Sequence, residues 1–179
     1  MTMDTTMATP LGELTLRATD QGLSSCVFTS GARTNARRVR PRTRTGNANL
    51  AQVWLDRACG EFEAFFAGEL TEFTVPVDLS RVDPPARQAL TALDDVGYGQ
   101  TTTYRGLALL AGDNEPQGAQ RAGIAMARNP ILIRVPCHRV LAADGSLRGY
   151  RGGLDRKRAL LDLESAARQT EAGAQPAAA

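Results

Sequence analysis

The sequence contains little histidine and little cysteine, with one and three residues respectively among 179. The three thiols, Cys26, Cys59 and Cys137, are odd in number and widely spaced, which is unlike the disulfide framework of a small secreted domain. A four-ligand zinc site would need every thiol together with His138, and no Cys-x-x-Cys pair is present. We therefore expect neither a disulfide framework nor a metal site.

Long apolar runs are also missing. No stretch of about 18 apolar residues occurs, so we expect no membrane-spanning helix and no membrane partner. The first seven residues include Asp4 and lack the basic and apolar regions of a secretory signal. With 42% apolar and 22% charged residues the composition is typical of a globular protein, and we expect it to be cytoplasmic.

Positive and negative charges nearly balance, at a net charge of +2. Residues 1–79 hold 8 basic and 9 acidic side chains, whereas residues 80–165 hold 12 and 9. The second half is therefore the mildly basic one. This distribution is compatible with nucleic-acid binding and does not by itself establish it.

Residues 9–29 predict a β-hairpin. Leu14 and Leu16 alternate with polar residues, and residues 20–28 supply a turn and a returning strand. Cys26 lies within that second strand, where a buried core thiol is its expected role.

A helix and a further strand complete a small α+β domain over residues 1–79. Apolar residues recur at helical spacing from Leu50 to Phe66, and Gly68 follows as a helix-terminating glycine. Residues 71–79 predict a short strand, in which a proline indicates a sheet edge.

Two segments have no periodic apolar face. Residues 30–48 contain six arginines and predict a long solvated loop, with an arm that contacts nucleic acid as the alternative. Residues 168–179 have few apolar anchors and predict a disordered tail.

Residues 80–167 predict a second, mainly helical domain. Helices are expected over residues 86–93, 104–111, 117–128 and 154–167. Only a four-residue turn separates the second helix from the third, which makes the pair a candidate helix-turn-helix, with plain helix packing as the alternative.

The helix over residues 117–128 is rich in glycine and alanine. An interior glycine costs roughly 1 kcal/mol relative to alanine, so small side chains must serve a purpose there. Such a face can approach a widened DNA minor groove, or it can pack closely against another helix or strand. The pattern leaves both explanations open.

The best candidate for chemistry lies in residues 129–140, NPILIRVPCHRV. An apolar strand is expected over residues 131–135, and Cys137 follows beside the only histidine, which indicates a thiol that can become a thiolate. Adjacent residues on a strand point to opposite faces, so a direct hydrogen bond from Cys137 to His138 requires Pro136 to break the strand, or a water to bridge the two groups. A core cysteine beside a surface histidine is the alternative.

This motif, together with GSLRGYRGGLDRKRALLDLE at residues 145–164, resembles the O6-alkylguanine-DNA alkyltransferase family. The similarity extends to TPLGELTL and FFAGELTEFTVPVDL in the first half, so it covers roughly residues 8–165. The resemblance implies a small N-terminal α+β, ribonuclease H-like domain. A mostly helical domain with a winged-helix-like helix-turn-helix would follow.

The resemblance also implies a reaction. Cys137 matches the alkyl acceptor, His138 would take its proton through a bridging water, and Glu164 would orient and charge-balance the imidazole. Asn129 matches the hinge residue whose side chain ties the turn to the active site. The implied activity is an irreversible transfer from O6-alkylguanine in double-stranded DNA to Cys137, once per molecule and without a cofactor.

Residues that bind DNA and the extruded base follow from the same resemblance. Tyr104 matches the tyrosine that presses on the phosphate 3′ of the target and helps rotate the nucleotide outward. Lys157 and the helix over residues 117–128, including Ala122, match the DNA-facing half. The positions around the extruded guanine are matched by Met126, Val140, Tyr150, Arg151, Gly152 and Gly153.

The chain departs from the family in how it would handle DNA. The family has an arginine nine residues before the hinge asparagine, which takes the place of the flipped base; Gln120 stands there in this chain. Arg121 is rotated by about 100° around the helix, and it would be the finger only if the helix has lost one residue. In the preceding helix, Pro85 and Leu90 stand at the family's aromatic positions.

The resemblance thus implies a monomeric DNA-repair enzyme of the methylated-DNA–protein-cysteine methyltransferase family. Two alternatives stay open. One is a sensor that binds and flips the lesion without chemistry, against which Cys137 argues and which Gln120 keeps open. The other is a thiol alkyl acceptor for a small molecule.

Overall fold

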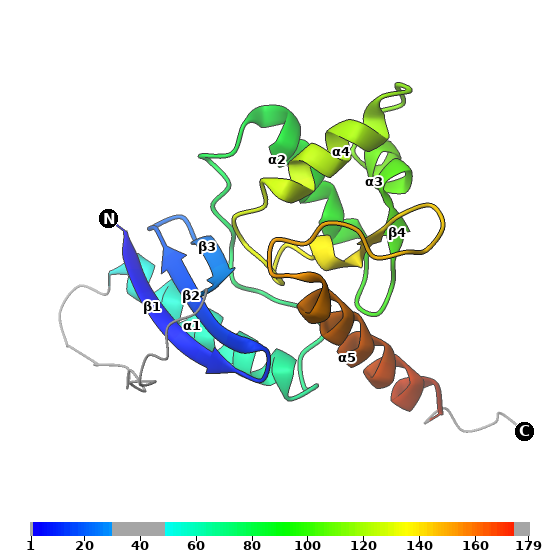
Figure 1. Cartoon of the computed structure of the whole chain (residues 1–179). Coiled ribbons are helices and arrows are strands. Elements are labelled where there is room, and N and C mark those ends of the chain that lie inside the picture. Colours follow the sequence, from blue (N-terminus) through cyan, green and yellow to red (C-terminus); the bar gives the residue numbers. More distant parts are fainter. Residues whose placement is uncertain (1, 30–48, 174–179) are drawn as a thin grey trace, which may run out of the picture.

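The computed structural model describes residues 2–29 and 49–173 (Figure 1). The arginine-rich segment, residues 30–48, and the end of the predicted tail, residues 174–179, lie outside the described residues. A β-sheet with one helix forms the first half of the chain, and helices dominate the second (Figure 1). The buried side chains of the two halves form one hydrophobic core.

A three-stranded antiparallel sheet has the order β1-β2-β3, with β1 at Met3–Thr9, β2 at Gly12–Ala18 and β3 at Leu23–Phe28. The hairpin of β2 and β3 is as predicted, and Leu14 and Leu16 are fully buried. β1 is not among the predicted strands, because its inward positions are only half-buried and give a weak apolar alternation.

Helix α1, Leu50–Phe66, packs on the sheet and confirms the prediction from apolar spacing. Asn49 caps its start by accepting a hydrogen bond from Ala51 N at 3.1 Å. Gly68 follows the helix with φ +76°, a left-handed conformation that ends helices. Phe62 points inward and is fully buried.

Residues 71–79 do not form the predicted strand. They make one parallel bridge, Leu23 to Val77, in which Leu23 N donates to Pro76 O and Asp78 N donates to Leu23 O, both at 2.8 Å. Pro76 has no N–H to donate, so the pairing does not continue as a ladder.

The second half contains helices and short strands. In chain order they are α2 Pro84–Thr91, η1 Ala92–Asp95, β4 Thr102–Thr103, α3 Tyr104–Leu110, α4 Gly118–Ala127, η2 Cys137–Arg139, β5 Val140–Leu141 and α5 Leu154–Gly173. α2, α3 and α4 agree with the predicted helices to within two residues at their starts. α5 continues beyond residue 167, so the predicted disordered tail is wrong for residues 168–173.

Helices α3 and α4 form a packed pair, and α2 packs against α4 (Figure 1). Thr103 caps α3 by accepting a hydrogen bond from Gly106 N at 3.0 Å. A Cβ added at Gly118 would lie 3.0 Å from the Cβ of Ala108. At this position the small side chain serves close packing between the two helices.

Residues 131–135 do not form the predicted strand either. Val135 N donates to Ile131 O at 3.0 Å, and Ile133 has φ +72°, a conformation that β-branched residues rarely adopt. The chain therefore turns tightly and enters η2 rather than running straight into Cys137. The premise that Cys137 and His138 leave opposite faces of a strand is wrong, and both are buried.

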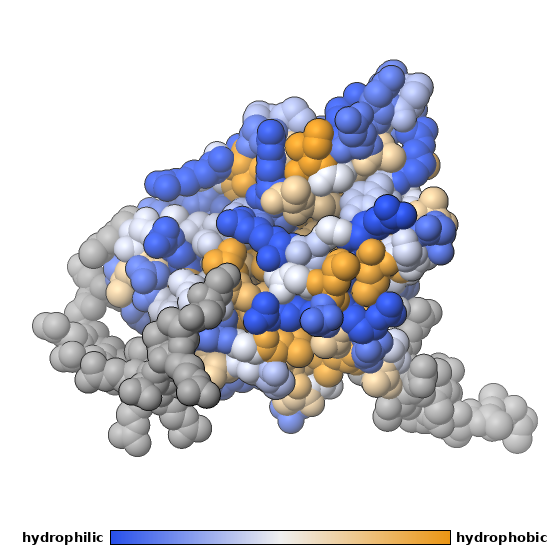
Figure 2. All heavy atoms as spheres, in the orientation of Figure 1, coloured by the Kyte–Doolittle hydropathy of each residue, from blue (hydrophilic) through white to orange (hydrophobic). Residues whose placement is uncertain are grey.

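Hydrophobic residues appear on the face in Figure 2 in separate groups between hydrophilic ones. Among the described helices, none is long and apolar enough to cross a membrane.

Candidate active site

Cys137 lies in η2, with 5% of its surface exposed, beside the side chain of Asn129. Asn129 Nδ2 donates to Cys137 Sγ at 3.1 Å and to Val135 O at 2.9 Å, while its Oδ1 accepts from Ile131 N at 2.9 Å. One fully buried amide therefore holds both ends of the 131–135 turn and orients a donor toward the sulfur. These contacts tie the turn to Cys137, as a hinge role for Asn129 would require.

His138 is fully buried, and its Nε2 lies 2.8 Å from Glu164 Oε1. Glu164 is an ionised acceptor, so Nε2 donates and Nδ1 is left with its lone pair. Nδ1 is also buried and has no hydrogen-bond partner among the described residues. The imidazole is thus held in the tautomer that can accept a proton at Nδ1.

Glu164 has two partners besides His138. Arg139 Nε donates to Oε2 at 2.9 Å and Arg139 Nη2 donates to Oε1 at 2.9 Å, a bidentate ion pair in the protein interior. Gly99 N donates to Oε2 at 3.0 Å. Arg139 Nη1 also donates to Val96 O at 2.6 Å, which ties the carboxylate to the segment before α3.

Burial raises the pKa of the Cys137 thiol to about 11, even though the hydrogen bond from Asn129 and the charge of Lys157 lower it. The resting group is therefore a thiol at neutral pH. Burial raises the pKa of Cys59 to about 11 as well, so acidity does not distinguish the two thiols. What distinguishes Cys137 is its neighbours, an amide donor and a histidine.

The pKa values of His138 and Glu164 are shifted in directions that suit a proton acceptor and its support. Burial lowers the pKa of His138, against the raising effect of Glu164, so the imidazole is neutral at neutral pH. Burial alone would raise the pKa of Glu164, but hydrogen bonds and charges from His138 and Arg139 lower it to about 2. Glu164 therefore stays ionised and can stabilise an imidazolium.

Lys157, which matches a position in the family's DNA-facing half, is fully buried. Its Nζ donates to Val140 O at 2.7 Å and to Arg148 O at 2.8 Å. Burial lowers the pKa of the ammonium group, while the proximity of Cys137 raises it. Lys157 therefore fastens the 145–153 loop to β5 and places a positive charge near the sulfur.

Tyr150 and Gly152 cover the histidine side of the site. The Tyr150 ring lies edge-on to His138, with 6.4 Å between ring centroids. A Cβ on Gly152 would come within 2.6 Å of the Tyr150 ring and 2.9 Å of the Phe28 ring, so only glycine fits there. The loop thus passes between an aromatic from the first half and one beside the reactive group.

Tyr104, at the start of α3, contacts the same 145–153 loop. Its hydroxyl donates to Arg148 O at 3.4 Å, and its pKa is raised by burial and by the nearby Cys137. A Cβ on Gly123 of α4 would lie 3.8 Å from the Tyr104 ring. The face of α4 that contains Gly123 therefore borders the reactive side.

Known proteins are similar to both halves of the chain. Residues 3–79 match the family described as 6-O-methylguanine DNA methyltransferase, ribonuclease-like domain, and residues 84–166 match its DNA binding domain. A methylated-DNA–protein-cysteine methyltransferase of Mycolicibacterium paratuberculosis is 41% identical over 162 residues, which cover 89% of this chain and 90% of that protein. The chain belongs to the O6-methylguanine DNA methyltransferase family.

Further relatives are similar over part or all of the chain. A methylated-DNA–protein-cysteine methyltransferase of Mycobacterium tuberculosis is 49% identical over 107 residues, 60% of this chain, and the match spans 63% of that protein's length. The crystal structure of Mycobacterium tuberculosis O6-methylguanine methyltransferase covers 99% of this chain and 97% of its own, with TM-score 0.75 and 34% identity. The structure of the tuberculosis protein in complex with DNA covers 90% and 92%, with TM-score 0.73 and 36% identity.

The methyltransferase family explains the two-domain architecture, and the structure brings most of the predicted site residues together. Asn129 and Cys137 form one hydrogen-bonded pair and His138 and Glu164 form another, and the two pairs adjoin along the chain at Cys137 and His138. Near them lie the predicted base-binding residues Tyr104, Met126, Val140, Tyr150, Arg151, Gly152 and Gly153; among these, Arg151 reaches Asn129 O at 3.5 Å, and Met126 and Val140 are buried.

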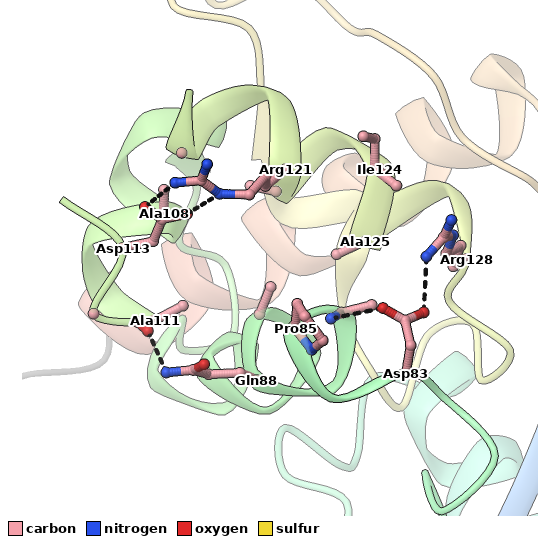
Figure 3. A pocket seen from close by; sticks show the side chains of 15 residues that line it. Asp83, Pro85, Gln88, Ala108, Ala111, Asp113, Arg121, Ile124, Ala125 and Arg128 are labelled. Atoms are coloured by element: carbon pink, nitrogen blue, oxygen red, sulfur yellow. Dashed lines mark hydrogen bonds and ion pairs between the residues drawn. The ribbon is translucent and has the colours of Figure 1, made fainter. Parts of the chain in front are cut away.

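Three predicted DNA contacts on α4 are placed differently from one another. Gln120 is exposed. Arg121 and Ala122 line a groove between α2 and α4, on the side of α4 that faces α2 (Figure 3). Arg121 donates to Asp113 through Nε at 2.7 Å and Nη2 at 2.5 Å. Ala122 is buried in the hydrophobic core.

Two residues of this site are not among the predicted ones. Arg139 stands inside the PCHRV motif, and a cation within so apolar a segment is the sequence signal that it has a buried partner. Gly99 contributes only its backbone N–H to Glu164, for which no side-chain signal exists. No group of three or more histidine, cysteine, aspartate or glutamate residues able to hold a metal ion occurs in the described part of the chain.

Proposed function

We propose that this protein repairs DNA directly, by transferring the alkyl group of O6-alkylguanine to Sγ of Cys137 in a single irreversible turnover. The observation on which this rests is that the Asn129–Cys137 pair adjoins the His138–Glu164 pair along the chain, with Nε2 of the histidine fixed by Glu164 and Nδ1 buried without a hydrogen-bond partner among the described residues. Membership of the methyltransferase family supports the same reaction.

The first step is removal of the thiol proton. Since the Cys137 pKa is about 11, a base must act at neutral pH, because only the thiolate is a strong nucleophile. His138 Nδ1 is the available base, and a buried polar atom of this kind needs a partner. A water between Nδ1 and Sγ would meet that need and pass the proton, while Glu164 and Arg139 hold the opposite side of the ring.

The second step is displacement at carbon. The Cys137 sulfur attacks the alkyl carbon attached to O6, a carbon–sulfur bond forms, and the carbon–oxygen bond breaks with its electron pair going to guanine. Guanine then takes up one proton, which balances the proton lost by the thiol. The product is a thioether, which has no ready leaving group, so the sulfur is consumed.

The substrate must reach a sulfur that is 5% exposed. A guanine inside a duplex is stacked and paired, so it must rotate out of the helix to be attacked, at a cost of a few kcal/mol. We assign DNA contact to residues 80–167 and structural support of the site to residues 1–79. Tyr104, beside Gly123 and the 145–153 loop, is positioned to contact the strand that contains the lesion.

The test is to incubate the protein with DNA containing O6-methylguanine and determine the mass of the tryptic peptide that contains Cys137. We expect a gain of one methyl group, at most one per protein molecule, and no gain in the Cys137→Ser variant. Cys59 serves as an internal control, because its thiol has a similar pKa but lies in α1, without a neighbouring histidine in the sequence.

Other outcomes point elsewhere. Tight binding of the alkylated DNA without a mass gain would indicate a lesion sensor. A mass gain with a free alkylated base but not with any DNA would indicate a small-molecule acceptor. Methylation of Cys59 rather than Cys137 would refute the assignment of the acceptor.

A further inference from the structure

The helix group that meets DNA in the proposed function has little positive charge. Residues 83–128, which contain α2, α3 and α4, include four arginines and five acidic residues, a net charge of −1. Residues 129–158, which contain the reactive loop, include seven basic and two acidic residues, a net charge of +5. Duplex binding depends on basic side chains that neutralise phosphates, so the helix group is poorly equipped for it.

The arginines of this helix group are also engaged within the protein. Arg121 forms the bidentate pair with Asp113, and Arg128 Nη1 donates to Asp83 Oδ1 at 2.8 Å. Figure 3 shows these two pairs at opposite ends of the groove between α2 and α4, which has a volume of about 600 Å³. The positive charges of both arginines are therefore paired with carboxylates that line this groove.

The two remaining arginines bind backbone carbonyls. Arg105 donates to Glu115 O at 2.6 Å and to Asn114 O at 3.1 Å, across the turn between α3 and α4. Arg87 donates to Ser80 O at 3.1 Å and to Val82 O at 2.9 Å.

Helix geometry places Arg121 and Arg128 away from the reactive side of α4, which is the face that contains Gly123 and borders Tyr104. Gly123 faces Tyr104, and each residue advances by about 100° around a helix. Arg121 and Arg128 both lie roughly 150° from Gly123, on nearly the opposite face. Gln120 lies about 60° from Gly123, on the reactive side, and is exposed and uncharged.

We propose that this protein acts preferentially on O6-alkylguanine that is already outside a base stack, in single strands or at unpaired positions, because α4 presents Gln120 and no cation on its reactive side. The inference rests on the proposed function and adds a substrate class to it. A duplex lesion needs a group that holds the space left by the flipped base and attracts the phosphates. Gln120 offers neither charge nor a long reach, whereas an unstacked base needs neither.

The positive charge of the 145–153 loop and of the start of α5 suits a single-stranded substrate. Arg148, Arg151 and Arg158 are exposed and lie in the 145–153 loop or at the start of α5. A flexible single strand can bend to bring its phosphates to these arginines while its base enters beside Tyr150. A rigid duplex has to lie against α4 as well.

The test compares single-turnover transfer to Cys137 from one O6-methylguanine oligonucleotide, either single-stranded or paired with its complement. We expect the wild-type rate on the single strand to exceed the rate on the duplex. Gln120→Arg should raise the duplex rate roughly tenfold and leave the single-strand rate within about twofold, because it adds the missing cation on the reactive side.

Glu115→Gln is the matched control, since it changes the net charge by the same amount at an exposed residue in the turn between α3 and α4. It should change neither rate by more than about twofold. If Gln120→Arg does not fold, as judged by circular dichroism, Gln120→Lys serves as the same test.

The inference is overturned if the wild-type protein reacts with the duplex as fast as, or faster than, with the single strand. It is also overturned if Gln120→Arg speeds both substrates equally, or if Glu115→Gln speeds the duplex as much as Gln120→Arg does. These results would leave the proposed function intact. An absence of transfer to Cys137 from either substrate would instead refute the proposed function.

Discussion

At the scale of single residues, the reactive group combines an unreactive resting thiol with a base that is ready to act. The pKa of Cys137 is raised to about 11 by burial, and the pKa of His138 is lowered from 6.5 by burial. Near neutral pH the pair is therefore a thiol and a neutral imidazole, with no charge buried on either. Charge separates only when substrate is present and the proton moves.

This arrangement predicts the pH dependence of the transfer rate. The imidazole must be neutral to accept the proton, and its pKa is lowered, so activity should persist below pH 6.5 and be lost as the pH falls further. On the alkaline side the rate should stay level until the pH approaches 11, where Cys137 ionises unaided. Single-turnover rates on single-stranded O6-methylguanine DNA across this range provide the measurement.

Glu164→Gln supplies the control for that profile. Loss of the carboxylate removes the negative charge that raises the His138 pKa, so the acid midpoint should move to a still lower pH while the rate decreases at every pH. A wild-type midpoint above pH 6.5 would contradict the assignment of His138 as the base.

The chemistry at this scale follows from sequence to a large extent, because Cys137, His138 and Asn129 lie within one short motif. Glu164 lies 26 residues after His138 and is recognisable only through the family resemblance. Lys157 illustrates the limit of prediction from sequence. A lysine is ordinarily a surface residue, and nothing local indicates that two backbone carbonyls, from Val140 and Arg148, replace its water.

At the scale of elements, the turn between α3 and α4 controls which arginines are available. Asp113 accepts both bonds from Arg121 and also a hydrogen bond from Glu115 N at 3.2 Å. The pKa of Asp113 is lowered mainly by Arg121, so the pair stays charged at any pH near neutral.

Asp113→Asn should therefore strengthen binding to unmodified duplex DNA. The variant keeps an oxygen for the turn but releases Arg121 for phosphate contact, which should steepen the dependence of log K on log salt by about one unit. Fluorescence anisotropy over a range of salt concentrations measures that slope. The rate on duplex lesions should gain less than in Gln120→Arg, because Arg121 points away from the reactive side.

The comparison for this variant is again Glu115→Gln, which removes one negative charge without releasing an arginine side chain. Equal slopes for the two variants would mean that net charge alone governs binding and that the ion pair does not sequester Arg121.

Helices are the elements that sequence predicts well here, and the irregular segments are those it does not. The apolar spacing of α1, with its cap at Asn49 and stop at Gly68, contains all the information that its boundaries require. Residues 131–135 have the composition of a buried strand, yet tertiary contacts and the left-handed Ile133 turn them into a loop. The strand prediction for residues 71–79 is wrong because Pro76 limits their pairing to one bridge.

At the scale of the whole molecule, the first half of the chain supports the reactive loop. Phe28 at the end of β3 packs under Gly152, and the guanidinium carbon of Arg156 lies 4.4 Å from the centre of its ring. Arg156 Nε also donates to Leu11 O at 2.7 Å, which joins α5 to the turn between β1 and β2. The sheet thus holds the loop that contains Tyr150.

Phe28→Ala should weaken both stability and activity. Loss of a buried aromatic ring costs about 3–5 kcal/mol, and the cavity would free Gly152 and Tyr150 to shift away from His138. Urea denaturation and the transfer rate on single-stranded substrate measure the two effects. Phe28→Leu retains most of the volume and should lose only the cation–π contribution of about 0.5–1 kcal/mol.

A large loss of stability in Phe28→Ala with an unchanged transfer rate would show that the loop keeps its geometry without the Phe28 ring. That result would restrict the role of the first half to folding.

The backbone bridges made by β3 have a consequence for how the chain can be divided. Cys26 N donates to Pro130 O and Leu132 N donates to Cys26 O, both at 2.8 Å, so the reactive loop occupies the outer edge of β3. A strand edge without such a cover offers its peptide groups to other chains and promotes aggregation. The segment that positions Cys137 therefore also protects the sheet against self-association, and residues 1–79 expressed alone should be prone to aggregate.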